Sequence, residues 1–304
     1  MTAARPRDKA LAADLVLVFV TAIWGSTFVV NQLVASGEAP PLLFLLLRFS
    51  IAAVILVLFA RGRPRTPGLL RDSLVVGGLT AIGIGFQLAG QVYTTASKAA
   101  FITGLSVPLT APVALLVTRK RPSPENLAGL AVATAGFVIL AWPRELSGLN
   151  TGDLLVLVTA VSYAYVVVRL SESSGRHDVR WFAFGQTACA AAVALLLRLA
   201  IHPFLGRPEA LFRAEARLPD VDARFLGLLL WMSLAATVLT FLLMTWAQAR
   251  MTATHAAVIY ALEPVFAAFL AALFLGEQLS GREFWGGSLV LLGILVSESP
   301  LSRK

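Results

Sequence analysis

The sequence predicts an all-α integral membrane protein in which ten transmembrane helices form two inverted five-helix repeats. Three observations lead to this expectation. Of the 304 residues, 58% are hydrophobic and 14% are charged, which is about half the charged share of a soluble domain. The apolar residues gather in runs close to the ~20 residues that a helix needs to cross a bilayer. Residues of the first half also recur at matching places in the second half.

The apolar runs are expected to be helices because the hydrocarbon core offers a backbone amide no partner outside its own segment. The strands of a membrane barrel would alternate polar and apolar residues, and runs such as Leu42–Leu47 do not. A long charged loop separates the seventh and eighth runs, and the other connections are short. The expected spans cover residues 13–35, 41–60, 72–93, 99–118, 124–142, 152–170, 181–200, 225–248, 255–275 and 283–298.

The distribution of basic residues predicts that both termini lie in the cytoplasm. In this orientation 16 of the 25 Lys and Arg residues fall in cytoplasmic segments, three in short outer loops, five in the long outer loop and one, Arg48, within a span. Cytoplasmic loops of membrane proteins are enriched in Lys and Arg. The net charge of +8 is therefore interpreted as an orientation signal, and no nucleic-acid partner is expected.

An internal repeat divides the chain into residues 1–149 and 150–304. Because each part holds five spans, an odd number, the second part must insert upside down relative to the first. Inverted repeats of this kind are common in secondary transporters, whose substrate site lies near the bilayer midplane where the halves meet. At an offset of 157 positions, the residues Gln91, Thr95, Ala96, Ala99, Ala100 and Ile102 match Gln248, Thr252, Ala253, Ala256, Ala257 and Ile259.

Polar side chains recur at helical spacing within the spans and therefore share faces of the helices. A polar face is costly toward lipid, so each either lines a hydrated cavity or forms hydrogen bonds between helices. Aromatic residues far from the span ends are added because their rings suit aromatic or cationic substrates. The cavity candidates are Trp24, Asn31, Gln87, Gln91, Thr103, Ser106, Tyr163, Tyr165 and Tyr260.

Prolines interrupt the fourth and ninth spans in matching places. Pro108, Pro112 and Pro264 each remove a backbone amide and disturb the carbonyl four residues earlier. Interruptions at corresponding positions of two repeats indicate a gate or a binding site for the substrate. The alternative is a static kink, which is frequent in membrane helices.

Two charged residues, Arg48 and Glu263, lie deep within spans. Each is about eight residues from the end of its span, or ~12 Å along a helix, and they enter from opposite faces. A structural or gating role is expected for both. The alternatives are that each binds one end of a zwitterion, or that Glu263 carries a coupling proton. Asp14 and Asp153 occupy matching places at span ends and are expected to be solvated caps, and His255 is expected to be exposed.

Several short motifs occur in a fixed order along the chain: AIWGSTF at Ala22–Phe28, LRF at Leu47–Phe49, YTTAS at Tyr93–Ser97, and LEPV at Leu262–Val265 followed by Gly276-Glu277. Together with Pro108 they resemble the drug/metabolite transporter (DMT) superfamily and its EamA-like branch, in a style closest to the aromatic amino acid exporters (YddG-like). The likeness covers essentially the whole chain, although the acid before the ninth-span proline has no counterpart before Pro108.

This resemblance implies a ten-helix carrier of the bacterial inner (plasma) membrane with both termini inside. It further implies export of amino acids, other metabolites or toxic compounds. The expected function is a secondary transporter, an exporter or facilitator of amino acids or related small metabolites that works by alternating access. Its expected partners are this small-molecule substrate and the lipid bilayer. The oligomeric state is left open, and a monomer is compatible with the sequence.

Other functions are weighed against this one. A proton-coupled efflux carrier for toxic organic cations or drugs is the main alternative. A membrane-embedded lipid-modifying enzyme would need convergent acids or histidines, and a channel would need a filter or ring, and neither pattern is visible. No catalytic residue, cofactor or metal site is expected, because the 3 histidines and Cys189 lie far apart.

Overall fold

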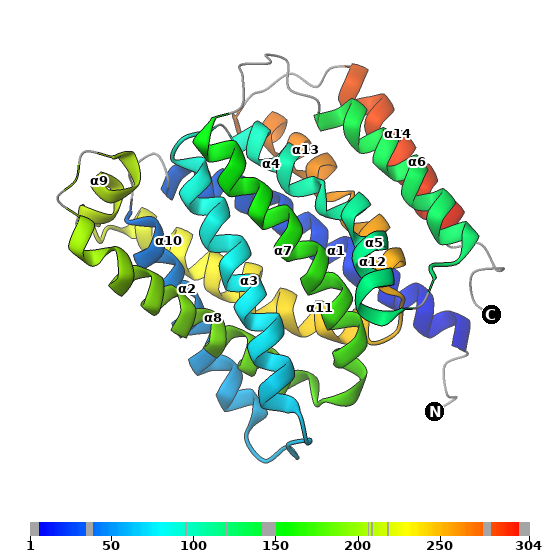
Figure 1. Cartoon of the computed structure of the whole chain (residues 1–304), viewed down its shortest axis with the longest axis horizontal. Coiled ribbons are helices and arrows are strands. Elements are labelled where there is room, and N and C mark those ends of the chain that lie inside the picture. The colour runs from blue at the N-terminus through cyan, green and yellow to red at the C-terminus, as the bar shows by residue number, and fades with distance from the viewer. Residues whose placement is uncertain are drawn as a thin grey trace.

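The computed structural model describes residues 6–34, 39–94, 96–119, 121–141, 150–205, 207, 209–217, 219–275 and 281–297, whose regular secondary structure is helical and includes no strand (Figure 1). The expected all-α class is therefore confirmed for these residues. The motif residues Gly276 and Glu277, and the basic residues Arg5, Arg303 and Lys304, lie outside the described ranges.

Residues 6–141 form six helices. Prolines mark several of the helix starts, as expected for a residue with no amide hydrogen and a fixed φ. Gly68, which precedes one helix with φ of 81°, adopts the left-handed conformation that favours glycine. The helices are α1 (Pro6–Leu33), α2 (Pro41–Ala60), α3 (Leu69–Gln91), α4 (Ala96–Gly104), α5 (Ser106–Thr118) and α6 (Pro124–Ala141).

Residues 150–297 form a second set of helices. Asn150 and Asp153 begin this set with a capping box, in which each side chain accepts from the other residue's backbone amide. The elements are α7 (Thr151–Ser173), η2 (Ser174–Arg176), α8 (Val179–Ile201), η3 (His202–Phe204), α9 (Ala210–Ala216), α10 (Ala223–Leu230), the π-helix η4 (Trp231–Leu239), α11 (Thr240–Gln248), α12 (Ala253–Tyr260), α13 (Glu263–Leu275) and α14 (Gly281–Ser297).

Each of the ten expected spans coincides with a helix or with consecutive helices, and the bounds differ by a few residues. Six stretches of the described chain are long and apolar enough to cross a membrane: 10–31, 41–60, 69–91, 151–176, 179–204 and 223–248. The apolar helical stretches 102–118, 124–139, 253–267 and 284–297 are shorter, at 10–17 residues.

The fourth and ninth expected spans are both broken. The fourth consists of α4 and α5, which meet at Leu105, and the ninth consists of α12 and α13, which meet at Ala261 and Leu262. Pro264 is the second residue of α13, a position where proline fits a helix start. Its missing amide prevents α12 from continuing, so the break follows from the sequence. Glu263, ahead of it, places a negative charge at the positive end of the α13 dipole.

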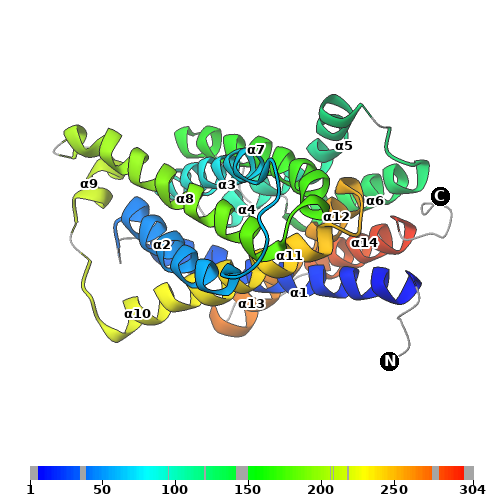
Figure 2. The same cartoon turned by 90° about the horizontal axis from the view of Figure 1, so that it is seen from below.

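The helices pack in two layers (Figure 2). α3 and α7 lie in one layer, and α1, α10 and α11 lie in the other. α7 packs against α3 and α5, and α1 packs against α11 and α13. These two sets consist of elements at matching places in the two halves of the chain. α6 packs along α14 at the edge of the bundle, and α2 packs along α8.

The α6–α14 contact depends on small residues, which let the backbones of two membrane helices approach closely. A Cβ atom placed on Gly129 would lie 2.6 Å from the carbonyl oxygen of Gly293, and one on Gly293 would lie 2.6 Å from the carbonyl oxygen of Gly129. Gly136 meets the carbonyl oxygen of Gly286 at the same 2.6 Å. The two backbones therefore touch directly, which a larger side chain at these positions would prevent.

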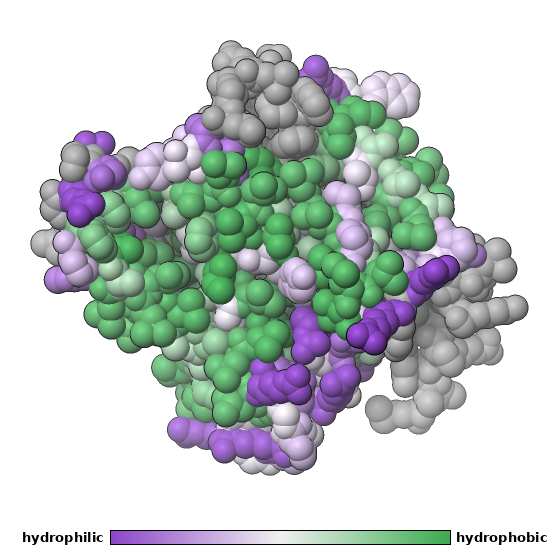
Figure 3. Space-filling model, in the orientation of Figure 1, coloured by the Kyte–Doolittle hydropathy of each residue, from purple (hydrophilic) through white to green (hydrophobic). Residues whose placement is uncertain are grey.

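Large apolar side chains cover much of the outer surface. On α7 the exposed Leu154, Leu157, Val158 and Val161 form one stripe at helical spacing. Figure 3 shows such apolar residues across the face over α3, α7 and α8, with hydrophilic residues gathered along the lower edge and beside α9. A water-soluble monomer rarely exposes so large an apolar surface. The apolar outer surface of this protein is suited to contact with lipid.

One buried carboxylate ties the long loop to the bundle. Glu215 of α9 accepts a hydrogen bond from the backbone amide of Leu42, in the first turn of α2, and pairs with Arg198 of α8 at 2.5 Å. Burial raises the pKa of Glu215 above its usual value, and the Leu42 amide and Arg198 only partly oppose this effect. The amide of Leu42 has no partner within its own helix, so Glu215 acts as its cap.

Candidate functional site

A cavity with about 790 Å³ of atom-free space, part of it open to solvent, lies between the two sets of helices. α1, α2, α3, α5, α7, α11, α12 and α13 all contribute to it, so both halves of the chain form its wall. The lining residues are Trp24, Thr27, Asn31, Arg48, Thr80, Ile84, Gln87, Ser106, Tyr163, Val166, Val167, Phe241, Met244, Gln248, Tyr260 and Glu263.

Aromatic rings from α1 and α12 meet in this cavity. The rings of Trp24 and Tyr260 stack with centroids 5.5 Å apart and an angle of 27° between planes. The Trp24 indole donates to Oγ1 of Thr240 at 3.2 Å, and the Tyr260 hydroxyl accepts from Nε2 of Gln248 at 2.6 Å. Each ring is therefore held by a second contact, which presents a fixed aromatic surface to a ligand.

Arg48 is the cation of the cavity, and a π-helix holds it. Its Nε donates to Oγ1 of Thr237 at 2.7 Å, and its Nη2 donates to the carbonyl oxygen of Ala236 at 3.1 Å. Both acceptors belong to η4, and π-helical segments are frequent at functional sites. The Thr237 hydroxyl in turn donates a hydrogen bond to the carbonyl of Met232 at 2.7 Å. Arg48 is 4% exposed, and its guanidinium forms no ion pair with Glu263.

Glu263 is the acid of the cavity lining, and it begins α13 beyond the break in the ninth span. Asn31 also lines the cavity, is 2% exposed, and has no hydrogen-bond partner for its Oδ1 atom in the structure. A carboxylate and an open amide oxygen are both acceptors. The lining therefore presents hydrogen-bond acceptors at Glu263 and Asn31 and a positive charge at Arg48.

The two broken spans contribute corresponding residues. Ser106 is the first residue of α5 and Glu263 the first residue of α13, and both line the cavity. A smaller pocket of about 340 Å³ adjoins these two residues and extends between the half-helices. Thr103, whose buried Oγ1 atom lacks a partner, and Pro264 line this smaller pocket. The break positions thus lie at the cavity wall rather than toward lipid.

The structure brings together most of the residues that the sequence singles out. Trp24, Asn31, Gln87, Ser106, Tyr163, Tyr260, Arg48 and Glu263 line the large cavity, and Thr103 and Pro264 the small pocket. Gln91, Tyr165, Pro108 and Pro112 are not part of either lining. Gln91 is 2% exposed with neither amide atom hydrogen-bonded, and Tyr165 packs against the apolar cluster of Val113, Ala114, Ala164 and Val168.

Sequence reasoning misses the apolar part of the wall. Ile84, Val166, Val167, Phe241 and Met244 line the cavity without a polar atom to distinguish them from lipid-facing residues. One signal was present, because Phe241, Met244 and Gln248 follow one another at i, i+3 and i+7 and so share a face with a polar residue. Three expectations at span ends were wrong: Asp14 and Asp153 are buried rather than solvated, and His255 is bonded to Asp14, as described below.

Comparison with known families and structures agrees with this architecture. The model of the EamA-like transporter family matches the chain twice, over residues 11–142 and 150–298. The chain belongs to the EamA-like transporter family. A solved crystal structure superposes with a TM-score of 0.74, covering 96% of this chain and 98% of the other at 19% sequence identity, which shows a shared fold.

Relatives of this EamA-like protein are named as transporters. An uncharacterized transporter of Archaeoglobus fulgidus is 31% identical over 288 residues, covering 95% of this chain and 86% of the relative. A probable amino-acid metabolite efflux pump of Salmonella typhimurium is 27% identical over 289 residues, covering 92% of each chain. A protein of the same description from Escherichia coli is 24% identical, again covering 92% of each chain.

Proposed function

We propose that this EamA-like transporter is a secondary carrier that exports amino acids or related zwitterionic metabolites by alternating access. The observation that carries the proposal is the placement of opposite charges in one cavity: Arg48 for a carboxylate, and Glu263 with the open Oδ1 of Asn31 for an ammonium group. Guanidinium and carboxylate groups bind opposite charges by charge-assisted hydrogen bonds. The names of the Salmonella and Escherichia coli relatives support this substrate class.

The proposal includes the arrangement in the membrane. We place all ten apolar segments across the bacterial inner membrane, with residues 1–149 and 150–304 as two inverted halves. The broken spans, which carry Ser106 and Glu263, then open and close as gates on the two sides of the cavity. Both termini are placed in the cytoplasm because the basic residues concentrate there. The bonds that connect the start of α1 to the end of α14 support a common side for the two ends.

Counterflow in proteoliposomes tests the substrate class. Three related probes separate the two ends of the substrate: phenylalanine, phenethylamine without the carboxylate, and 3-phenylpropionate without the ammonium group. Phenylalanine should exchange saturably, and each analogue should compete at least about tenfold more weakly, since a hydrogen bond to a charged group contributes about 1.5–3 kcal/mol. Equal competition by all three probes would contradict recognition of a zwitterion.

Variants of Glu263 test the assignment of the ammonium site. Glu263→Gln keeps the shape of the side chain and removes its charge, so the apparent affinity for phenylalanine should fall about tenfold or more. Glu209→Gln is the matched control, because Glu209 is exposed ahead of α9, far from the cavity lining. Unchanged affinity in Glu263→Gln would show that Glu263 does not bind the ammonium group of the substrate.

A second function, proton-coupled efflux of organic cations, is favoured by one observation. Glu263 shares the cavity with Trp24, Tyr163 and Tyr260, and aromatic faces beside an acid suit a bulky cation. This carrier would move phenethylamine or a quaternary ammonium ion in preference to phenylalanine. It would also accumulate that cation against its gradient when an opposing pH gradient is imposed, and Glu263→Gln would abolish that accumulation.

A further inference from the structure

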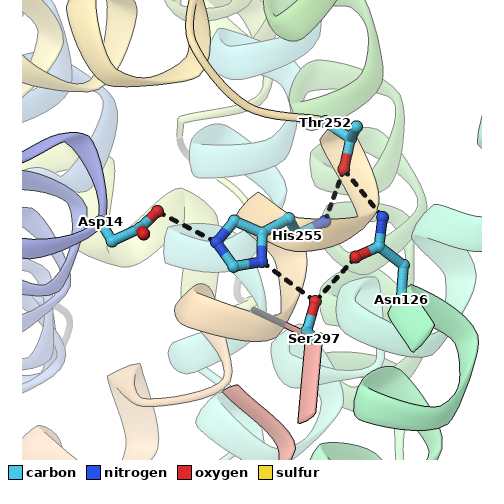
Figure 4. A network of polar contacts seen from close by, with 5 residues as sticks. All are labelled: Asp14, Asn126, Thr252, His255 and Ser297. Carbon is cyan, nitrogen blue, oxygen red and sulfur yellow. Dashed lines mark hydrogen bonds and ion pairs between the residues drawn. The ribbon is translucent and has the colours of Figure 1, made fainter. Parts of the chain in front are cut away.

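A second polar cluster lies where α12 begins, against α1, α6 and α14 (Figure 4). Nε2 of His255 lies 3.0 Å from Oδ1 of Asp14, and its Nδ1 lies 3.0 Å from Oγ of Ser297. Ser297 donates to Oδ1 of Asn126 at 2.9 Å. Nδ2 of Asn126 and the backbone amide of His255 both donate to Oγ1 of Thr252. We call these five residues the His255 cluster.

The geometry of the His255 cluster determines where its protons lie. With the Asn126 amide oriented as in the structure, Ser297 donates its single hydroxyl proton to Asn126 and can only accept from Nδ1 of His255. Nδ1 therefore carries a proton. The contact between Nε2 and the Asp14 carboxylate needs a second proton, because a bare ring nitrogen and an ionised carboxylate are both acceptors. The bonded pair thus holds one exchangeable proton between His255 and Asp14.

This proton lies within reach of water at one face of the bundle. The side chains of His255 and Asp14 are 12% and 9% exposed, so they are shielded but not sealed. Ser297 is the last residue of α14, and Asn126 lies in the first turn of α6, which places the cluster at helix ends. Histidine is the side chain that ordinarily changes its charge between pH 5 and 8. The pair can therefore exchange its proton with the aqueous phase on this side.

The same helix connects the cluster to the cavity. α12 carries His255 in its first turn and ends at Tyr260, where the ninth span breaks before Glu263 begins α13. At that end Tyr260 stacks on Trp24 of α1. α1 and α12 are thus joined twice, by the His255–Asp14 pair at the face of the bundle and by the ring stack at the cavity. Release of the first joint would leave α12 free to move at its outer end.

A corresponding joint on the other side of the bundle has no imidazole. Asp153 in the first turn of α7 accepts from Oγ1 of Thr94 at 2.8 Å, and Nδ2 of Asn150 donates to the carbonyl of Tyr93 at 3.2 Å. Asp153 matches Asp14 in the repeat, and Thr94 precedes α4 as His255 begins α12. The Thr94 hydroxyl and the backbone amide of Asn150, which both donate to the Asp153 carboxylate, do not titrate near neutral pH.

We propose that His255 and Asp14 form a proton-binding site that holds α12 against α1 when it is loaded and releases α12 when it is empty. Loss of the proton leaves the cluster one donor short. With Ser297 still donating to Asn126, two acceptors then face each other across the 3.0 Å contact between His255 and Asp14, and this arrangement costs the free energy of an unmade hydrogen bond. α12 then separates from α1, and the cavity opens toward the face at which α1 begins.

Other charged side chains occur on the elements packed around α12. Arg169 and Glu172 of α7 pair with each other at 3.6 Å, and Arg250 ahead of α12 donates to the carbonyl of Trp246. Glu125 begins α6 and Arg119 follows α5. The ring of His255 is bonded to Asp14 and Ser297, so Asp14 is the charged group that its nitrogens face.

Hydrogen–deuterium exchange of the purified full chain, without substrate, measures the release of α12 directly. Protection factors are taken for the amides of α12 between about pH 6 and 9, so that the intrinsic pH dependence of exchange is removed. Release of one proton should lower the protection of α12 in the wild type by up to about tenfold per pH unit over the range in which opening is coupled to loss of that proton. Asp14→Asn should show no such slope, because an amide can bond either form of the ring.

Two further variants make the outcome decisive. His255→Gln also keeps a non-titrating partner for Asp14, and its α12 protection should likewise be independent of pH. Asp153→Asn is the matched control on the opposite side, and its α12 should follow the wild-type profile. The same profile in wild type and Asp14→Asn, whether sloped or flat, would overturn the proposal, as would a flat profile in Asp153→Asn.

The importance of this site for transport rests on the proposed carrier function, and counterflow separates the two ideas. With substrate exchange measured at several pH values on the side where α1 begins, wild type should depend on pH and Asp14→Asn should not. A pH-dependent α12 in a protein without counterflow would refute the carrier and leave the proton site. Counterflow with equal pH dependence in both proteins would refute the proton site and leave the carrier.

Discussion

The contact between α6 and α14 allows a quantitative test of the packing. In Gly129→Ala the new methyl group would lie 2.6 Å from the carbonyl oxygen of Gly293 and 2.6 Å from Cβ of Ser297. An ordinary contact between non-bonded heavy atoms is about 3.5 Å. Neither the Gly293 carbonyl oxygen nor Cβ of Ser297 is the end of a flexible side chain, so α14 must move away from α6 by about 0.9 Å, the difference between those two values.

This displacement has a definite cost. A gap of about 0.5–1 Å loses a quarter to a half of the dispersion energy between the atoms on either side. Overpacking of one methyl group ordinarily destabilises a protein by about 1–3 kcal/mol. At roughly 2–4 °C for each kcal/mol, the thermal unfolding midpoint should fall by on the order of 5 °C. Because Gly293 meets the same spot from α14, Gly129→Ala and Gly293→Ala should not add.

Thermal unfolding in detergent, followed by tryptophan fluorescence, measures the effect, and the chain supplies a matched control. Gly227 lies within α10, and a Cβ atom there would meet nothing within 4 Å. Gly227→Ala should keep or raise the midpoint, because Ala is favoured over Gly in a helix by about 0.5–1 kcal/mol. Equal midpoints for Gly129→Ala and Gly227→Ala would refute the close contact of the two backbones.

Two further substitutions test buried polar contacts. Glu215→Gln should abolish a pH dependence of stability: a folded-state pKa above the usual 4.5 stabilises the fold fully below that value, and this contribution is lost as pH rises through the raised pKa. The unfolding midpoint of wild type relative to Glu215→Gln should therefore decrease as pH rises from 4.5, and a constant difference would contradict this. Tyr260→Phe removes the acceptor of Gln248 but keeps the ring that stacks on Trp24. Its unfolding midpoint should fall by the equivalent of about 1–3 kcal/mol with the apparent affinity for phenylalanine unchanged, and a large loss of affinity would assign the hydroxyl to the substrate.

The helices could be predicted because a segment that crosses the lipid must be apolar and must satisfy its own backbone hydrogen bonds. A run of apolar residues between polar segments marks a helix, and α2 begins and ends at the expected residues 41 and 60. The break in the ninth span could also be predicted, since Pro264 prevents α12 from continuing. The π-helix η4 could not, because its residues, Trp231–Leu239, are ordinary helix formers. Arg48, which is distant in sequence, donates to Thr237 and to the carbonyl of Ala236 in this segment, and no local pattern indicates these contacts.

The cavity was predicted where a polar or aromatic residue faces it and missed where the wall is apolar. Asn31 and Gln87 stand out in an apolar span, because a buried amide needs a reason to be there. Val166 and Phe241 do not, because the same residues would serve equally well against lipid. The bond between Asp14 and His255 joins residues 241 positions apart. No spacing along one helix could indicate it, and only the packing of α1 on α12 brings the pair together.

The π-helix also sets how one span meets its two neighbours. Bonding from i to i+5 winds the backbone less tightly than an α-helix, so η4 turns α11 relative to α10 by an angle that regular winding would not produce. Phe225 and Leu229 of α10 pack with Phe44 of α2, while Phe241 and Met244 of α11 face the cavity. A loss of one residue from this stretch would restore regular winding and rotate every inward side chain of the following helix. The π-helix η4 therefore sets the rotation of α11 relative to α10, so that α10 packs against neighbouring helices while α11 faces the cavity.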